Sequence, residues 1–129
     1  IGCALLDLAI HQNPDAQIDP RAFVEAQLDA LAMPRAVGLR HRFPCFTHIF
    51  DGGYSAAYYS YAWSEALDAD AFEAFVATGD IFDPDLASRF REEILAAGNS
   101  RDPMASFQAF LGRAPDGTAL MRARHLLDA

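Results

Sequence analysis

The sequence contains no lysine, only two cysteines and no long hydrophobic run. All ten of its basic residues are arginines, and eighteen Asp and Glu outweigh them to give a formal net charge of -8. Nucleic acids and anionic membranes are bound by basic surfaces that neutralise phosphate groups, and a chain of this charge is unsuited to that task. We therefore expect no nucleic-acid partner and no membrane partner.

The two cysteines have no regular spacing. Cys3 and Cys45 lie far apart in the sequence, so no disulfide framework is indicated and a reducing compartment is the default expectation. No apolar run approaches the length that a bilayer-spanning helix needs, and no basic-then-apolar secretory leader is recognisable. These features together predict a cytoplasmic location.

The residues that are abundant describe a helical globular chain. Its 129 residues, 52% hydrophobic and 22% charged, match one ordinary domain with enough apolar mass for a core. No stretch alternates with period two over more than a few residues, so we predict an all-α fold built as an irregular array of helices. Three Asp-Pro pairs are typical of an N-cap followed by proline in the first turn: Asp19-Pro20, Asp83-Pro84 and Asp102-Pro103.

Hydrophobic periodicity places the helices. It predicts helices over residues 3–11, 20–33, 54–67, 68–78, 84–97, 103–111 and from about 118, with Gly79, Gly98 and Gly112 as stops. Residues 34–47 form a long ordered connection in this reading, with extended chain considered for residues 41–46. The side chains expected to point inward include Phe72, Phe75, Val76, Leu86, Phe90, Ile94, Leu95, Phe107, Phe110 and Leu111.

One stretch is unlike the rest of the chain. Residues 48–65 hold one His, four Tyr, one Trp and a Gly pair within eighteen positions. If a helix begins at Tyr54, then Tyr54, Tyr58 and Tyr61 follow at intervals of four and three and share one face. The pair Gly52-Gly53 would allow a sharp loop that brings His48 over the end of that face. This stretch is therefore a candidate site.

Other readings of these residues remain open. From their spacing alone, the tyrosines are better interpreted as amphipathic aromatics at a helix boundary, with rings buried and hydroxyls in water. His48, beside the Gly pair and near hydroxyl donors, is a fair candidate for stabilising an oxyanion. A zinc site at His41, Cys45 and His48 is disfavoured because no second Cys or His pair accompanies them. Cys45 reads better as a small buried hydrophobe.

Long segments resemble a known enzyme family. The segments at Phe46–Phe72 (FTHIFDGGYSAAYYSYAWSEALDADAF), Ile81–Met104 (IFDPDLASRFREEILAAGNSRDPM) and Phe110–Pro115 (FLGRAP) resemble the C-terminal part of the thimet-oligopeptidase family of zinc metallopeptidases. The resemblance covers essentially the whole chain and is nearest to the bacterial oligopeptidase A and peptidyl-dipeptidase branch. It implies that residues 1–129 are the C-terminal helical portion of a larger, mostly helical catalytic domain.

The resemblance also implies roles. The family's zinc is held by a His-Glu-x-x-His helix and a later Glu, and neither is present, so the metal-binding helix would lie upstream of Ile1. The matching positions imply that His48 and Tyr61 are catalytic donors to the oxyanion. They imply that Tyr54 binds substrate from a loop containing Gly52 and Gly53, with weaker support for Tyr58. Asp51 stands where relatives often have a small residue.

The expected partners follow from this reading. They are short peptide substrates and the remainder of the parent polypeptide, and the chain alone is expected to be inactive. Apolar surface that the missing neighbours would cover predicts self-association of the isolated chain. The alternative function is a non-enzymatic helical module that binds a peptide or a protein through its tyrosine-rich face.

Overall fold

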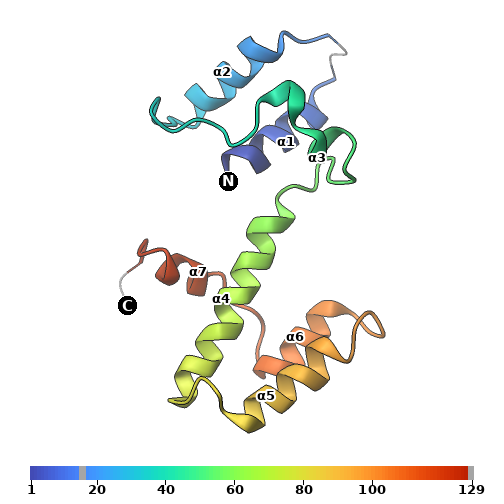
Figure 1. The fold of residues 1–129 in the computed structure, drawn as a ribbon, viewed down its shortest axis with the longest axis vertical. Coiled ribbons are helices and arrows are strands. Elements are labelled where there is room, and N and C mark those ends of the chain that lie inside the picture. Colours follow the sequence, from blue (N-terminus) through green and yellow to red (C-terminus); the bar gives the residue numbers. More distant parts are fainter. Residues whose placement is uncertain (15–16, 128–129) are drawn as a thin grey trace. The chain divides into compact units, whose positions relative to one another are not determined.

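The regular secondary structure in the described part of the chain is all helical. A computed structural model describes residues 1–14 and 17–127, and within these residues there is no strand (Figure 1). The elements in order are α1 (Gly2–Gln12), α2 (Pro20–Ala30), the 3₁₀ turn η1 (Phe43–Cys45), α3 (Thr47–Phe50), α4 (Ser60–Thr78), α5 (Pro84–Phe90), the π-helical turn η2 (Arg91–Leu95), α6 (Pro103–Leu111) and α7 (Thr118–Ala123). The prediction of an all-α fold is confirmed.

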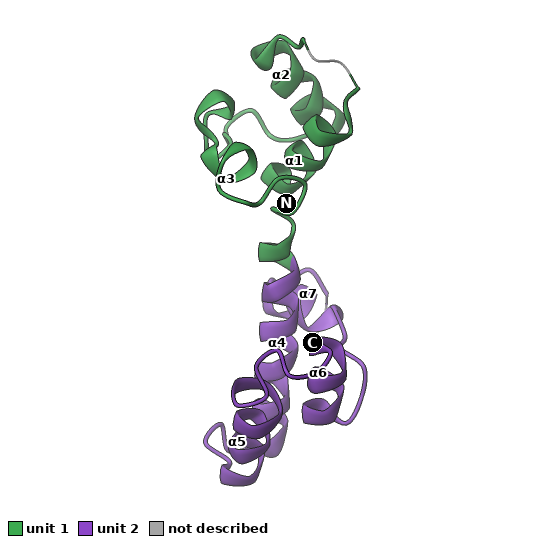
Figure 2. Cartoon of the chain, turned by 90° about the vertical axis from the view of Figure 1, so that its right-hand side faces the viewer, with its two compact units in different colours: residues 1–62 green, residues 63–129 purple. Residues whose placement is uncertain are grey.

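The chain divides into two compact units, residues 1–62 and residues 63–129 (Figure 2). Helices α1, α2 and α3 belong to the first unit, and helices α5, α6 and α7 belong to the second. Among the described residues, no helix combines the length and the apolar character that crossing a membrane would require.

The core of the first unit is built around the segment that joins α2 to α4. Its buried side chains are Leu6 of α1 and three residues of that segment, Phe43, Phe46 and Ile49. Half-buried side chains complete this core, among them Tyr58. Since the rings of Phe46 and Tyr58 meet edge to face with centroids 4.8 Å apart, the core directly supports one tyrosine of the candidate site.

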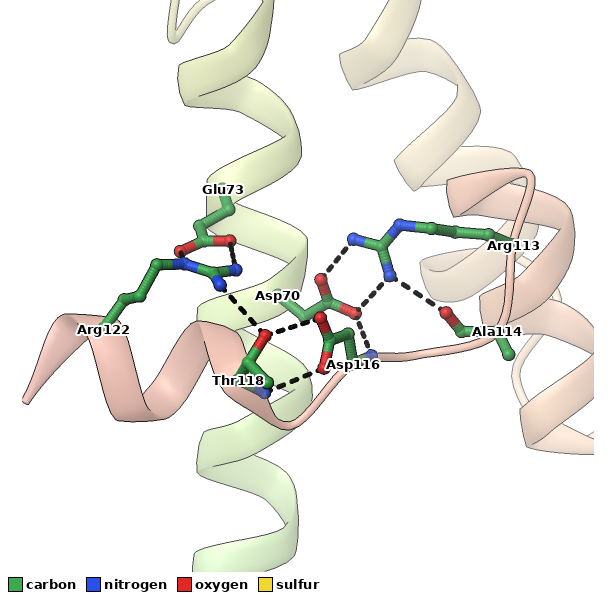
Figure 3. Close-up of polar contacts among 7 residues, drawn as sticks. All are labelled: Asp70, Glu73, Arg113, Ala114, Asp116, Thr118 and Arg122. Carbon is green, nitrogen blue, oxygen red and sulfur yellow. Dashed lines mark hydrogen bonds and ion pairs between the residues drawn. The ribbon is translucent and has the colours of Figure 1, made fainter. Parts of the chain in front are cut away.

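The second unit has its own core and a polar network beside it. Buried residues Ala71, Leu86, Phe107 and Phe110 come from α4, α5 and α6. The side chain of Asp70, on α4, is fully buried. Its carboxylate accepts from Arg113 Nη1 at 3.0 Å, from Arg113 Nη2, and from the Asp116 N–H at 2.8 Å (Figure 3). These bonds fasten the segment leading into α7 against α4.

The network continues along α7. Arg122 donates through Nε to Glu73 Oε1 at 2.8 Å and through Nη1 to the Thr118 hydroxyl at 3.0 Å (Figure 3). Arg124 pairs with Glu65, which lies earlier on α4. Helix α7 has six residues, and a helix of that length depends on such contacts because it is marginal on its own.

The predicted caps are confirmed. The carboxylate of Asp19 accepts from the N–H groups of Arg21 and Ala22, Asp83 accepts from Leu86 N–H at 2.7 Å, and Asp102 accepts from Ala105 N–H at 2.9 Å. Gly112 ends α6 in the left-handed conformation with φ 75°, as expected of a C-terminal glycine.

Four predictions about the elements are wrong. No helix begins at Tyr54, because residues 54–59 form turns and α4 starts at Ser60. Residues 60–78 are one continuous helix, so no break falls at residue 68. Residues 43–45 form a 3₁₀ turn where extended chain was considered. The helix predicted over residues 84–97 changes to a π-helical turn after Phe90.

Some side chains predicted to point inward are exposed, as is one cysteine. Phe72, Val76 and Leu95 are 57%, 53% and 64% exposed. The other elements of the second unit leave these side chains uncovered, two of them on α4 and Leu95 on η2. Cys45 is exposed as well, so its interpretation as a buried hydrophobe is wrong.

Candidate functional site

The candidate site lies at the tyrosine loop, which we define as residues 51–59 between α3 and α4. Two glycines shape its start for different reasons. A Cβ on Gly52 would lie 2.9 Å from the Cα of His48 and 3.2 Å from its carbonyl oxygen, so the backbone passes too close for any side chain. Gly53 has free space around it but adopts φ 77°, a left-handed conformation that favours glycine.

The glycine turn brings His48 back toward the tyrosines. The amide of Tyr54 donates to the carbonyl oxygen of His48 at 3.1 Å, which closes the turn. The Ser55 hydroxyl donates to the carbonyl oxygen of Ile49 at 2.7 Å and holds the next residue against α3. The half-buried ring of His48 then lies with its centroid 6.2 Å from that of Tyr54 and 6.0 Å from that of Tyr58.

The three tyrosines of the sequence prediction meet, although no single helix carries them. Tyr54 and Tyr61 stack with centroids 5.4 Å apart and an interplanar angle of 24°. Tyr58 lies between His48 and Tyr61, with its centroid 4.9 Å from that of Tyr61. We call His48, Tyr54, Tyr58 and Tyr61 the tyrosine cluster. It contains every predicted side-chain site residue, and its members come from α3, the tyrosine loop and the first turn of α4.

The members of the cluster differ in exposure. Tyr54 is 37% exposed and Tyr61 is 48% exposed, whereas Tyr58 is half-buried against the core of the first unit. The alternative reading, with buried rings and wet hydroxyls, therefore fits Tyr58 better than it fits Tyr54 or Tyr61. The two exposed rings offer a flat apolar surface together with two hydroxyl groups to a ligand.

Tyr61 keeps its proton more firmly than an ordinary tyrosine does. A hydrogen bond with the Tyr54 side chain raises the pKa of Tyr61 above its usual value, and partial desolvation and the neighbouring Tyr54 and Tyr58 raise the pKa further. The Tyr61 hydroxyl is neutral near pH 7, as an unperturbed tyrosine also is, and a neutral hydroxyl can donate a hydrogen bond.

The tyrosine loop is fastened from α1 by a residue that the sequence reading did not select. Asp7 is fully buried, and its carboxylate accepts from the N–H groups of Ala56 and Tyr58, each at 2.9 Å. The signal was present in the sequence as a lone charged residue within an apolar helix, four positions before His11. His41, which was considered from the sequence only as a zinc ligand, stacks its ring on Phe46 at 4.5 Å and lies 5.4 Å from the ring of His48.

The described residues do not fit a metal ion. Within residues 1–14 and 17–127, no group of three or more His, Cys, Asp or Glu side chains is arranged to hold one. His41, Cys45 and His48, considered from spacing alone, do not form such a group. What the cluster offers chemically is hydrogen-bond donors and aromatic surface.

An all-helical chain with paired glycines and clustered tyrosines has clear relatives. Residues 1–126 match the family model described as Peptidase family M3, and the chain belongs to that family. It is 37% identical over 129 residues to Oligopeptidase A of Haemophilus influenzae, covering 96% of this chain and 18% of the relative. It is 35% identical over 133 residues to Dipeptidyl carboxypeptidase of Salmonella typhimurium, covering 98% of this chain and 19% of the relative.

A plant relative matches a shorter part more closely. The Probable cytosolic oligopeptidase A of Arabidopsis thaliana is 49% identical over 92 residues, which is 68% of this chain and 13% of that protein. The chain thus spans less than a fifth of the length of each of these relatives: 18% of the Haemophilus protein, 19% of the Salmonella protein and 13% of the Arabidopsis protein. The resemblance to an oligopeptidase family is confirmed, and the family is one of metallopeptidases.

Proposed function

We propose that the full-length polypeptide containing residues 1–129 is a zinc-dependent oligopeptidase that hydrolyses short peptides in the cytoplasm. The support is membership of Peptidase family M3 and likeness to proteins named oligopeptidase A and dipeptidyl carboxypeptidase. Because the described residues do not fit a zinc site, we place the zinc-binding helix in a part of the polypeptide upstream of Ile1. Residues 1–129 would be the C-terminal helical portion of the catalytic domain.

In this proposal the tyrosine cluster forms the wall that binds the peptide. His48 and Tyr61 donate hydrogen bonds to the carbonyl oxygen of the scissile peptide as negative charge develops on it. A zinc ion held by another part of the polypeptide would supply Lewis-acid chemistry, polarising that carbonyl and activating a water molecule. Tyr54 and Tyr58 bind substrate with the backbone around Gly52 and Gly53. Donors held in place before reaction stabilise the transition state more than the ground state, because the charge they meet appears only there.

The observation that carries the proposal is the meeting of His48, Tyr54 and Tyr61 beside a glycine turn. Tyr54 and Tyr61 stack at 5.4 Å, and the hydrogen bond between them raises the pKa of Tyr61. Tyrosine hydroxyls are protonated near pH 7 at their ordinary pKa as well, so the position of Tyr61 in the cluster, and not the pKa shift, suits it to donate toward an oxyanion.

The test is Tyr61→Phe in the full-length enzyme. Removing one oxyanion donor should lower kcat by about 10²-fold to 10³-fold while KM changes little, because the lost bond acts mainly in the transition state. Turnover of a quenched-fluorescence peptide measures both constants. Tyr59→Phe is the matched control, because Tyr59 is 50% exposed and lies outside the cluster. Equal kcat for Tyr61→Phe and Tyr59→Phe would remove Tyr61 from the mechanism.

Residues 1–129 alone should be inactive under this proposal. Chelator-sensitive cleavage of peptide by the isolated chain would contradict the placement of the zinc ligands elsewhere. The non-enzymatic binding module considered from the sequence is not favoured, because the matched family and the named relatives are peptidases.

A further inference from the structure

The carboxylate of Asp7 is buried at the centre of the first unit, far in sequence from the residues it binds. Its side chain is 0% exposed, and the donors to Oδ1 and Oδ2 are Ala56 N–H and Tyr58 N–H, each at 2.9 Å. His11 Nδ1 lies 2.8 Å from Asp7 Oδ1 and 2.8 Å from the Asp7 carbonyl oxygen. Since both neighbours of Nδ1 are acceptors, Nδ1 carries the hydrogen. A buried carboxylate is tolerated only with such partners.

These bonds hold the backbone of residues 54–59 in a conformation that competes with a helix. Ala56 adopts φ 56°, a left-handed conformation that is unfavourable for any residue with a side chain. The spacing of Tyr54, Tyr58 and Tyr61 favours a helix starting at Tyr54. In such a helix the Tyr58 N–H would bond to the Tyr54 carbonyl oxygen. In the structure that N–H donates to Asp7 instead, and α4 begins at Ser60.

The position where α4 begins decides how the aromatic rings meet. On one helix, residues 54, 58 and 61 would be arranged in a row along its face. With the chain turned at Ala56, Tyr54 stacks on Tyr61 at 5.4 Å and Tyr58 reaches His48 at 6.0 Å. The stacked pair is also the one whose hydrogen bond raises the pKa of Tyr61.

We propose that Asp7 is a positioning residue: by accepting from Ala56 and Tyr58 it keeps residues 54–59 out of α4 and so assembles the tyrosine cluster. His11 helps to orient the Asp7 carboxylate through its Nδ1 contact with Oδ1. The catalytic consequence of this inference rests on the proposed function, whereas its structural part does not. Asp7 touches no substrate and acts only through Tyr54, Tyr58 and Tyr61.

The test is Asp7→Asn in the full-length enzyme. Asparagine has the same shape, but its NH₂ group cannot accept, so one of the two loop N–H groups loses its partner. Hydrogen exchange measured by mass spectrometry should rise in peptides covering residues 51–62. In peptide turnover, kcat should fall about 10-fold to 100-fold with KM within about threefold, because small displacements of catalytic groups mainly cost transition-state binding.

A matched control separates positioning from general destabilisation. Asp70→Asn removes acceptor capacity from an equally buried carboxylate whose partners, Arg113 and Asp116, both belong to the second unit. It should raise exchange in peptides covering residues 63–127 and leave both the exchange of residues 51–62 and kcat unchanged. If Asp7→Asn fails to accumulate as folded protein, His11→Phe provides the test, because it removes the Nδ1 donor while keeping a ring beside Phe50.

Two kinds of failure are distinguishable. If Asp7 acts through Tyr61, Asp7→Asn should lower kcat far less in a Tyr61→Phe background than in the wild type. Unchanged exchange of residues 51–62 in Asp7→Asn, or in His11→Phe where that variant is used, would overturn the inference by itself. Raised exchange together with a full-length protein that hydrolyses no peptide would overturn the proposed function and still support Asp7 as the anchor of the loop. Raised exchange together with a Tyr61→Phe enzyme as active as the wild type would remove only Tyr61 from the mechanism.

Discussion

At the scale of single residues, the two glycines before Tyr54 are required for different reasons. The Gly52 position excludes a Cβ because the backbone of His48 lies 2.9 Å away, and that backbone is held by α3. The Gly53 position has space for a Cβ, and what it needs is a φ of 77°. The first glycine therefore fixes the distance between His48 and the loop, and the second fixes the direction of the turn.

This difference predicts an order of effects. Gly52→Ala should cost about 1 to 3 kcal/mol, as overpacking does, and should lower kcat/KM at least about 10-fold because His48 or the loop must move. Gly53→Ala should cost about 1 to 2 kcal/mol of backbone strain, with a smaller loss of kcat/KM. Denaturation and peptide turnover of the full-length enzyme measure both quantities.

Gly38→Ala serves as the control for these two variants. Gly38 has no atom within 4 Å of a built Cβ and no left-handed φ, so alanine should be tolerated there. An activity of Gly52→Ala equal to that of Gly38→Ala would show that the close approach to His48 is not needed for function.

The sequence predicts which residues form the candidate site but not how they are arranged. The identity of the candidate site residues was accessible, because His48, Gly52, Gly53 and the tyrosines are concentrated in one stretch. Their arrangement was not, because the loop takes its shape from Asp7, 49 and 51 positions away from Ala56 and Tyr58. Local periodicity favours a helix at Tyr54, and a distant carboxylate overrides it.

At the scale of elements, helix ends were predictable where local chemistry decides them. The three Asp-Pro starts combine a side chain that accepts backbone N–H groups with a residue whose missing N–H is not needed, and all three cap helices. A new helix was also predicted to begin at residue 68, the first of two aspartates, Asp68 and Asp70, that no proline follows. In the structure α4 continues through them, and Asp70 accepts from Arg113 and Asp116 on another segment.

The Asp70 contacts give the second unit a dependence on pH. Burial raises the pKa of Asp70. Hydrogen bonds from Arg113 and the Asp116 N–H, together with the charge of Arg113, lower the pKa by more than burial raises it, so the pKa lies below its ordinary value of 3.8. A hydrogen bond from Arg122 likewise lowers the pKa of Glu73. Both carboxylates thus bind a proton more readily in the unfolded chain than in the folded one.

It follows that their contribution to stability is present above the ordinary carboxyl pKa and is lost as the pH falls through the lower folded values. The loss should extend progressively from about pH 5 downward. Asp70→Asn should reduce the free energy of unfolding by about 2 to 4 kcal/mol at pH 7, since it weakens a buried pair whose arginine is half-exposed. Urea denaturation of the full-length protein measures this difference.

The difference between wild type and Asp70→Asn should shrink between pH 7 and pH 3, because the wild type loses the same contribution by protonation. Asp85→Asn is the control, because Asp85 is an exposed residue of α5 outside this network. A difference between wild type and Asp70→Asn that stays constant with pH would contradict the lowered pKa of Asp70.

At the scale of the whole molecule, the exposed apolar side chains require an explanation. Trp63, Phe72 and Val76 of α4 are 55%, 57% and 53% exposed, and Phe82 is 81% exposed. Relatives are much longer, since this chain covers 18% of the Haemophilus protein and 19% of the Salmonella protein. We propose that the remainder of the polypeptide covers these side chains, and that copies of the isolated chain associate through them.

Phe72→Ala in the full-length protein tests this covering. Truncating a side chain that is exposed in the full-length protein changes the free energy of unfolding by at most about 0.5 kcal/mol. Truncating a covered phenylalanine should lower it by about 1.5 to 3 kcal/mol through lost apolar burial. We therefore expect Phe72→Ala to lower the urea midpoint clearly, while Gln108→Ala, at an exposed position of α6, leaves it unchanged. The isolated chain should sediment as oligomers, and Phe72→Ala should shift it toward monomer. Equal midpoints for the two variants, with a monomeric isolated chain, would mean that nothing covers Phe72.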